Sequence, residues 1–318
     1  MTGARFSIGQ ALTAGLRLSV RHPLAVLVWG GVMMLFSLLA AAVVIPIILS
    51  MFAAMPLDSY DAEASEALMQ SSLSFQLAIN GLNLVQLVLS LVVWTAAMRA
   101  TLRIGRPDKW FFMRLGMDEL RVAVVMLAIF LGLYIGVLII VLIGFAFGFA
   151  LHAAGEFAVV IGVFVLVLAV LIGLLAIWSR LSLMPPASII TGQFAFVEGW
   201  RMGRGQTLRL MALNLAIWLV FMAVYVLVGI IVAAILIGGF FASGAVWPED
   251  PQTPAEVLAA LKPMIGWAVL AFVPLTLFAG WAISFTAGAL TSAARQLADG
   301  ALPPVAPTEA RDGADASR

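Results

Sequence analysis

Six long apolar stretches constrain this chain more than any other feature, because none of them contains Asp, Glu, Lys or Arg. They cover residues 24–51, 73–98, 122–149, 157–178, 210–241 and 264–290. A helix needs about 20 consecutive apolar residues to cross the ~30 Å hydrocarbon core of a bilayer, and every stretch is longer than that. The strict alternation of membrane β-barrel strands is missing from them. The pattern predicts an all-α polytopic membrane protein with six transmembrane helices.

The composition of the whole chain supports the same conclusion. Hydrophobic residues make up 64% of the 318 residues, charged residues make up 10%, and the mean hydropathy is +1.12. A soluble domain carries about 25% charged residues, so this chain has too little polar surface to cover a water-soluble globule. The first stretch exceeds the roughly 7–15 apolar residues of a cleavable signal peptide, so we expect it to remain as the first span.

The basic residues fall on one side of the predicted membrane. Of the 17 lysines and arginines, only Lys262 lies elsewhere. The others occupy the N-terminal arm, the connections after the second and fourth stretches, and the C-terminal tail. The opposite side carries the acidic residues Asp58, Asp61, Glu63, Glu66, Glu156, Glu249, Asp250 and Glu256. The positive-inside rule therefore predicts that both termini are cytoplasmic.

This orientation can be tested by labelling single introduced cysteines, because the chain has no cysteine of its own. Cysteines at Ser65 and Ser243 should react with a membrane-impermeant thiol reagent added outside intact cells. A cysteine at Gly105 should not react. Labelling of Gly105 from outside would reverse the orientation.

Short amphipathic segments precede the first, third and fifth stretches. Such segments lie in the membrane interface with their apolar face at the acyl boundary. Before the first stretch, the residues that can share a helical face are Phe6, Ile8, Leu12, Leu16 and Val20. Before the third is "WFFMRLGMDELR", residues 110–121, and before the fifth are Phe194, Val197 and Trp200 at helical spacing.

The first and last of these segments also align with each other. Gly15, Arg17 and Leu24 match Gly199, Arg201 and Leu208 without a gap. We therefore consider that the chain consists of three units, each an in-plane helix followed by a helical hairpin. Residues 1–295 are predicted to form a single membrane domain. Residues 296–318 are rich in Pro, Ala, Asp and Gly and are predicted to be a flexible cytoplasmic tail.

The connection between the fourth and fifth stretches, "RLSLMPPASIITGQFAFVEGWRMGRGQTLRLM", has a predicted local structure. Pro185 and Pro186 should end the extension of the fourth span, since proline lacks an N–H donor and blocks the preceding turn. A short helix is expected over about 193–204. Gly205 is expected as its left-handed C-terminal cap. Thr207 is then expected to cap the fifth span.

This connection resembles a signature of uncharacterised bacterial six-helix membrane proteins related to the membrane domain of glycerophosphoryl diester phosphodiesterases. The matching residues are Arg180, Ser182, Leu183, Pro186, Trp200, Arg204 and Gly205. The chain departs from that pattern at Gly199, where the pattern has Ser, and at Gly203, where it has Thr. The resemblance implies a bacterial inner-membrane topology rather than an activity. We carry over no hydrolase activity, because the chain has no counterpart of the soluble phosphodiesterase domain.

No catalytic, cofactor or metal site is predicted. His22 and His152 belong to opposite sides of the membrane, and no HExxH motif or cluster of carboxylates accompanies them. "GRGQT" lacks the spacing and the lysine of a phosphate-binding Walker loop. The six stretches contain no ionisable Asp, Glu, Lys or Arg that would mark a proton relay or an ion pathway. We therefore expect a protein that is not an enzyme and has no nucleic-acid partner.

A polar stripe occurs in the second stretch. Its members follow one another at spacings of three and four residues and are Gln76, Asn80, Asn83, Gln86 and Ser90. One interpretation is hydrogen bonding between helices, with Tyr134 and Asn214 as partners. The alternative is the lining of a groove for a headgroup or a substrate.

Small residues predict close helix packing in two spans, because small-xxx-small patterns let helices approach each other. The sets are Gly132, Gly136, Gly144 and Gly148 in the third span, and Thr276, Gly280, Ser284 and Gly288 in the sixth. We expect such seams to pack within the chain.

These features favour a non-catalytic inner-membrane protein that acts as an accessory, scaffold or lipid-organising factor. Its partners would be membrane lipids, anionic ones in particular, or another membrane protein. The candidate headgroup-binding residues are Arg180, Trp200, Arg201, Arg204 and Arg209. The alternative function is a transporter or a lipid-translocating protein that uses the polar stripe. The sequence leaves the oligomeric state open.

Overall fold

The computed structural model describes residues 6–53, 62–103, 109–113, 115–152, 155–244, 259 and 262–301. Every regular element among them is helical, and six helices are long and apolar enough to cross a membrane. These are α2 (Pro23–Ala53), α3 (Ala62–Leu102), α4 (Met117–His152), α5 (Glu156–Leu181), α8 (Thr207–Ser243) and α10 (Ile265–Ala301). The predicted all-α fold with six candidate spans is confirmed. Each helix continues beyond the apolar stretch at one end or at both.

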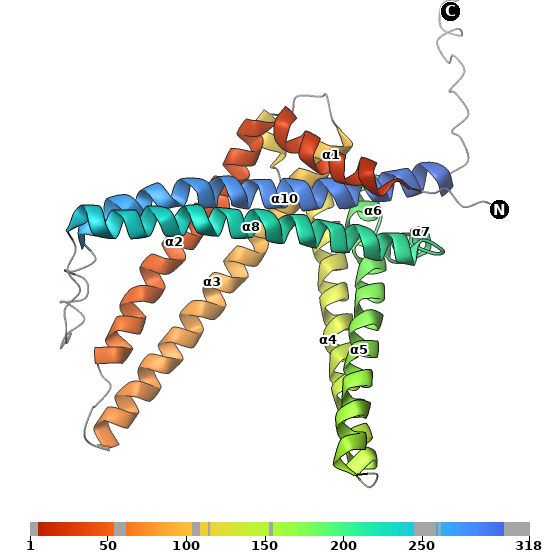
Figure 1. Ribbon diagram of the computed structural model, residues 1–318. Helices are drawn as coiled ribbons and strands as arrows, with labels where there is room; N and C mark the ends of the chain where they lie inside the picture. Colours follow the sequence, from red (N-terminus) through yellow and green to blue (C-terminus); the bar gives the residue numbers. More distant parts are fainter. Residues whose placement is uncertain are drawn as a thin grey trace, which may run out of the picture.

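The six long helices form three consecutive helical hairpins, α2–α3, α4–α5 and α8–α10 (Figure 1). The hairpins converge where the shorter helices α1 (Ile8–Arg21), α6 (Met184–Thr191) and α7 (Phe196–Met202) pack against α10. From there they point in different directions. We call this region of convergence the basic end, because the arginine-rich connections lead into it.

Burial is concentrated at the basic end. In α4 no described residue beyond Ile129 is buried, and in α5 only Ser179 is buried among the residues whose side chains are described. The far parts of these helices expose apolar side chains on all faces, which is the surface that lipid covers in a membrane protein. The protein core therefore holds the hairpins together at one end only.

Helix α10 is the centre of this core and contacts α1, α2, α3, α6, α7 and α8. Helix α1 runs antiparallel to it. The Ser7 N–H donates to Gln296 Oε1 at 2.9 Å near the start of α1, and the Ser19 and Ser284 hydroxyl oxygens lie 2.8 Å apart near its end. Because these contacts and the buried Leu297 extend the packed part of α10, the helix continues to Ala301, past the domain boundary predicted at residue 295. Residues 302–318 lie outside the described residues.

The predicted small-residue seam of the sixth span packs within the chain, as expected. A Cβ on Gly280 would overlap the carbonyl oxygen of Val26 in α2, and one on Gly288 would lie 2.7 Å from the Cα of Gly15 in α1. Backbones can approach this closely only where side chains are missing or small.

The corresponding prediction for the third span is wrong within the described residues. A Cβ at Gly132, Gly136 or Gly148 would meet no atom within 4 Å, and at Gly144 it would meet only Leu166 at 3.9 Å. The α4–α5 hairpin lies apart from the other two hairpins over this length, so no described helix of another hairpin packs on these glycines (Figure 1).

The short helices differ from the predicted amphipathic segments in their buried faces. Helix α1 buries Ala11, Gly15 and Leu18, whereas Leu16 and Val20 of the predicted apolar face are 45% and 79% exposed. Small residues face inward because α1 packs on the backbone of α10. Among the described residues of the connection before the third span, the regular element is a 3₁₀ turn, η1 (Lys109–Phe112), and the following "MDELR" residues form the first turn of α4. Another 3₁₀ turn, η2 (Lys262–Met264), precedes α10.

The connection between α5 and α8 has a different local structure from the predicted one. Helix α5 ends at Leu181, and the two prolines lie in the first turn of α6, where a missing N–H costs nothing. The C-cap of α7 is Gly203, in a right-handed conformation; Gly205, at φ +78°, is left-handed but lies beyond this cap, and the left-handed helix cap of this connection is Gly192 after α6. Thr207 is the first residue of α8, whose N-cap is Gln206.

The alignment between the first and last short segments has a structural counterpart. Gly15 and Gly199 are both buried in short helices, and a Cβ on either would clash with the backbone of a neighbouring helix. Leu24 and Leu208 are each the second residue of a long helix, and both are exposed. These equivalences agree with the repeat of a short helix followed by a hairpin in the first and third units.

Candidate functional site

Helix α7 packs on the rest of the basic end through its smallest residues. Ala195, Gly199 and Gly203 are buried, and they recur every four residues on one side of the segment. A Cβ on Gly199 would lie 2.7 Å from the Cα of Met184, so α7 meets α6 nearly backbone to backbone. At Gly199 the contact leaves no room for a side chain.

Three large apolar residues of the same segment are exposed, whereas Phe196 and Met202 are partly buried against the core. Phe194, Val197 and Trp200 are 45%, 59% and 38% exposed. Arg201 and Arg204 are exposed beside them, and neither side chain forms an ion pair with a described residue. Exposed aromatic and aliphatic side chains next to unpaired arginines are typical of a segment at a membrane interface.

Arg180 differs from the other predicted headgroup residues. Its Nε donates to the Thr207 hydroxyl at 2.8 Å, and its guanidinium carbon lies 5.1 Å from the centroid of the Trp200 ring. It is half-buried and joins the end of α5 to α7 and to the start of α8. We therefore remove Arg180 from the lipid-facing set and assign it to internal packing.

Further arginines at the basic end are available to solvent or lipid. We define the basic rim as the exposed residues Arg17, Arg21, Arg103, Arg201 and Arg204, together with the half-buried Arg209. Exposed Leu16 and Val20 lie beside Arg17 and Arg21 on α1, which repeats the arrangement on α7. Arg295 is excluded from the rim, since its Nε lies 3.9 Å from Asp299 Oδ2.

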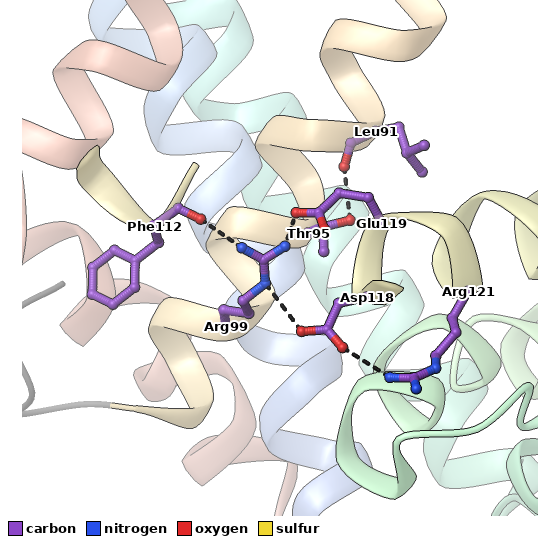
Figure 2. A network of polar contacts seen from close by, with 7 residues as sticks. All are labelled: Leu91, Thr95, Arg99, Phe112, Asp118, Glu119 and Arg121. Atoms are coloured by element: carbon purple, nitrogen blue, oxygen red, sulfur yellow. Dashed lines mark hydrogen bonds and ion pairs between the residues drawn. The ribbon is translucent and has the colours of Figure 1, made fainter. Parts of the chain in front are cut away.

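A buried ionic network lies between α3 and α4, and the sequence analysis did not find it (Figure 2). The Arg99 side chain is 2% exposed and forms an ion pair with Glu119, which is 6% exposed. Arg99 Nε lies 3.4 Å from Asp118 Oδ2, and its Nη1 donates to the Phe112 carbonyl at 2.9 Å. In the distribution of basic residues, Arg99 is one of many on the predicted cytoplasmic side, and nothing there distinguishes it. The available signal was the adjacent acidic pair in a connection otherwise rich in arginine.

The turn that receives Arg99 has an unusual backbone. Phe111 and Phe112 have φ angles of +54° and +63°, in the left-handed region that non-glycine residues avoid. Their carbonyl groups accept hydrogen bonds from Trp29 Nε1, at 3.1 Å, and from Arg99. Each such residue costs on the order of 1–3 kcal/mol, so these two donors and the buried Phe112 ring hold the turn in place.

No helix of the described part of the chain covers the polar stripe of α3. Gln76, Asn80, Asn83 and Gln86 are exposed, and their side chains form no hydrogen bond with the described residues. Ser90 donates to the carbonyl of its own helix at Leu87. The predicted interhelical bonds are not formed.

The two predicted partners of the stripe lie elsewhere. Asn214 Nδ2 donates to the Leu210 carbonyl of its own helix at 3.0 Å, and Tyr134 is 63% exposed. Both belong to other hairpins, which diverge from α2–α3 (Figure 1).

The described residues contain no group of three or more His, Asp or Glu side chains that could hold a metal ion. His22 lies at the α1–α2 junction, where its ring packs edge-on against Phe112 with the centroids 5.6 Å apart. An open groove between the far ends of α4 and α5 is lined by apolar residues such as Val141, Phe145 and Leu166. It contains no member of the polar stripe.

Comparison with protein-family models, with curated proteins and with solved structures finds no match for this chain. The relationship to the phosphodiesterase membrane domain stays a prediction.

Proposed function

We propose that this protein is a non-catalytic accessory or lipid-organising factor of the bacterial inner membrane, which gathers anionic lipid at its basic rim. The observation that carries the proposal is the arrangement of the segment 194–204. Its small residues pack inward, while Phe194, Val197 and Trp200 are exposed beside Arg201 and Arg204, which form no ion pair with a described residue.

In this proposal the rim works through two kinds of contact. The apolar side chains of α7 enter the acyl boundary, and the arginines reach headgroup phosphates from the same helix. Arginine suits this role because its planar guanidinium donates two parallel hydrogen bonds to a phosphate. Each basic residue near an anionic surface contributes about 1 kcal/mol, so the five exposed arginines together give a marked preference for anionic lipid.

Charge reversal at Arg201 and Arg204 tests the proposal. In the double variant Arg201→Glu, Arg204→Glu the amount of retained anionic lipid should fall by a factor of about ten or more. Two attractions of about 1 kcal/mol each are lost, and two repulsions between glutamate and anionic lipid are added. Native mass spectrometry of protein extracted from mixed anionic and zwitterionic membranes measures the retained lipid.

Arg295→Glu is the matched control, because Arg295 is exposed and lies in the same part of the fold but outside the rim. It should leave lipid retention near that of the unaltered protein. Equal retention by the folded double variant and the control would refute the proposed role of the rim.

A further inference from the structure

The polar stripe of α3 presents four carboxamides on a surface that the rest of the described chain leaves uncovered. Gln76, Asn80, Asn83 and Gln86 are exposed and make no hydrogen bond within it. A carboxamide without a hydrogen-bond partner is strongly disfavoured in hydrocarbon, because no water replaces the missing partner. Whatever covers this face must therefore supply both donors and acceptors.

The depth of the stripe excludes the headgroup region for its central members. Met98 is the last residue of the apolar stretch toward the basic end. At 1.5 Å per helical residue, Gln86 lies about 18 Å and Asn83 about 22 Å along α3 from Met98. Both positions fall within the ~30 Å hydrocarbon core.

The spacing of the stripe indicates the kind of partner. Gln76, Asn83 and Ser90 are seven residues apart, and Gln86 follows Asn83 by three. These spacings match positions a and d of the seven-residue repeat, abcdefg, along which two helices pack in a left-handed coiled coil. In such pairs a single Asn at an a position fixes the register and the number of helices. The polar positions therefore form a seam for one further helix.

We propose that this seam binds α3 of a second copy of the chain, so that the protein forms a twofold dimer in the membrane. Two copies inserted with the same orientation place their α3 helices parallel around an axis along the membrane normal, which brings each a position beside its own counterpart. A carboxamide carries both a donor and an acceptor, so Asn83 can bond to Asn83 of the other copy. In this register an identical stripe brings Gln76, Asn83 and Gln86 each beside its counterpart, while Asn80, four residues after Gln76, lies at the flanking e position.

The remainder of the structure leaves room for this dimer. Among the described residues, α3 has no buried residue between Leu73 and Val92, and the other two hairpins point away from this part of the helix (Figure 1). The open groove between α4 and α5 is apolar and lies on another hairpin, so it does not continue the stripe as a pathway. The dimer is independent of lipid binding at the basic rim.

Cysteine cross-linking of the full chain in native membranes tests the dimer directly, because the chain has no cysteine of its own. Ser90→Cys keeps all four carboxamides and places a thiol in the seam. On mild oxidation it should give a species of twice the monomer mass. Val85→Cys is the matched control, since Val85 is 49% exposed but lies about 160° around the helix from the centre of the stripe. It should remain monomeric.

A second variant separates recognition by the carboxamides from chance proximity. Adding Asn83→Leu and Gln86→Leu to Ser90→Cys should reduce the cross-linked fraction by about threefold for each hydrogen bond lost. The pair Val85→Leu with Ser90→Cys should cross-link as Ser90→Cys does. An undiminished cross-link in the leucine variant would overturn the proposal. A Ser90→Cys product whose mass shows a different protein would also overturn it. So would the absence of any cross-linked product from Ser90→Cys.

Discussion

Replacing Arg99 with leucine should lower the free energy of unfolding by about 3–5 kcal/mol, because the substitution leaves Glu119 buried without its partner. The Glu119 side chain is 6% exposed, so water cannot replace the guanidinium. The Phe112 carbonyl loses its donor in the same step, and the left-handed turn loses one of the two bonds that hold it. Unfolding in detergent, followed by circular dichroism against heat or denaturant, measures the change.

The double variant Arg99→Leu, Glu119→Leu distinguishes a buried pair from a generally sensitive position. Removing both charges should recover most of the lost stability, since apolar replacements of a complete buried pair are often neutral. Arg121→Ala is the mild control. Its ion pair with Asp118 at 3.1 Å is partly exposed, so the change should cost no more than about 1 kcal/mol. A double variant as unstable as Arg99→Leu alone would show that the ion pair is not the cause.

Adding one methyl group at Gly280 should also be severely destabilising. The new Cβ would overlap the carbonyl oxygen of Val26, which is backbone and cannot rotate away. Helices α2 and α10 must then separate, so Gly280→Ala should lower the free energy of unfolding by at least about 1–3 kcal/mol. The same unfolding assay measures it.

Gly132→Ala is the matched control for this substitution. Like Gly280, Gly132 is a helical glycine in a small-residue pattern, but a Cβ at Gly132 would meet no atom within 4 Å. Alanine should therefore stabilise α4 by about 0.5–1 kcal/mol through its better helix propensity. If Gly132→Ala destabilised the protein as much as Gly280→Ala does, the two glycine patterns would be equivalent and the described packing of α10 would be wrong.

Hydropathy predicted the helical elements of the fold well, because twenty or more apolar residues have few alternatives to a helix in lipid. The helix ends were harder to predict. Helix α3 begins at Ala62, well before the apolar stretch at residue 73, since polar residues such as Gln70 continue a helix once it leaves the hydrocarbon. Small-residue spacing identified the true seam at Gly280, but the same spacing at Gly132 faces no helix.

The candidate site was only partly predictable for a related reason. Periodicity identifies the residues that share a helical face but not the neighbour that the face meets. Helical spacing predicts that Phe194, Val197 and Trp200 share one face, and all three side chains are exposed. The partners proposed for the α3 stripe were wrong, because no local pattern shows that the hairpins diverge. Arg99 and Glu119 are separated by a 3₁₀ turn with an unusual backbone, and their pairing depends on that turn.

The central position of α10 also determines when the chain can finish folding. The seam that buries Gly15 and the start of α2 is supplied by the last long helix to be synthesised. Between Leu102, where the first hairpin ends, and Ile265 a ribosome adding about 5–20 residues per second needs roughly 8–33 s. During this interval the first hairpin is already made and inserted, but its glycine face has only lipid or a helper protein to cover it. Assembly of the basic end is therefore a late event, and premature termination before α10 would leave the earlier helices in the membrane without their common partner.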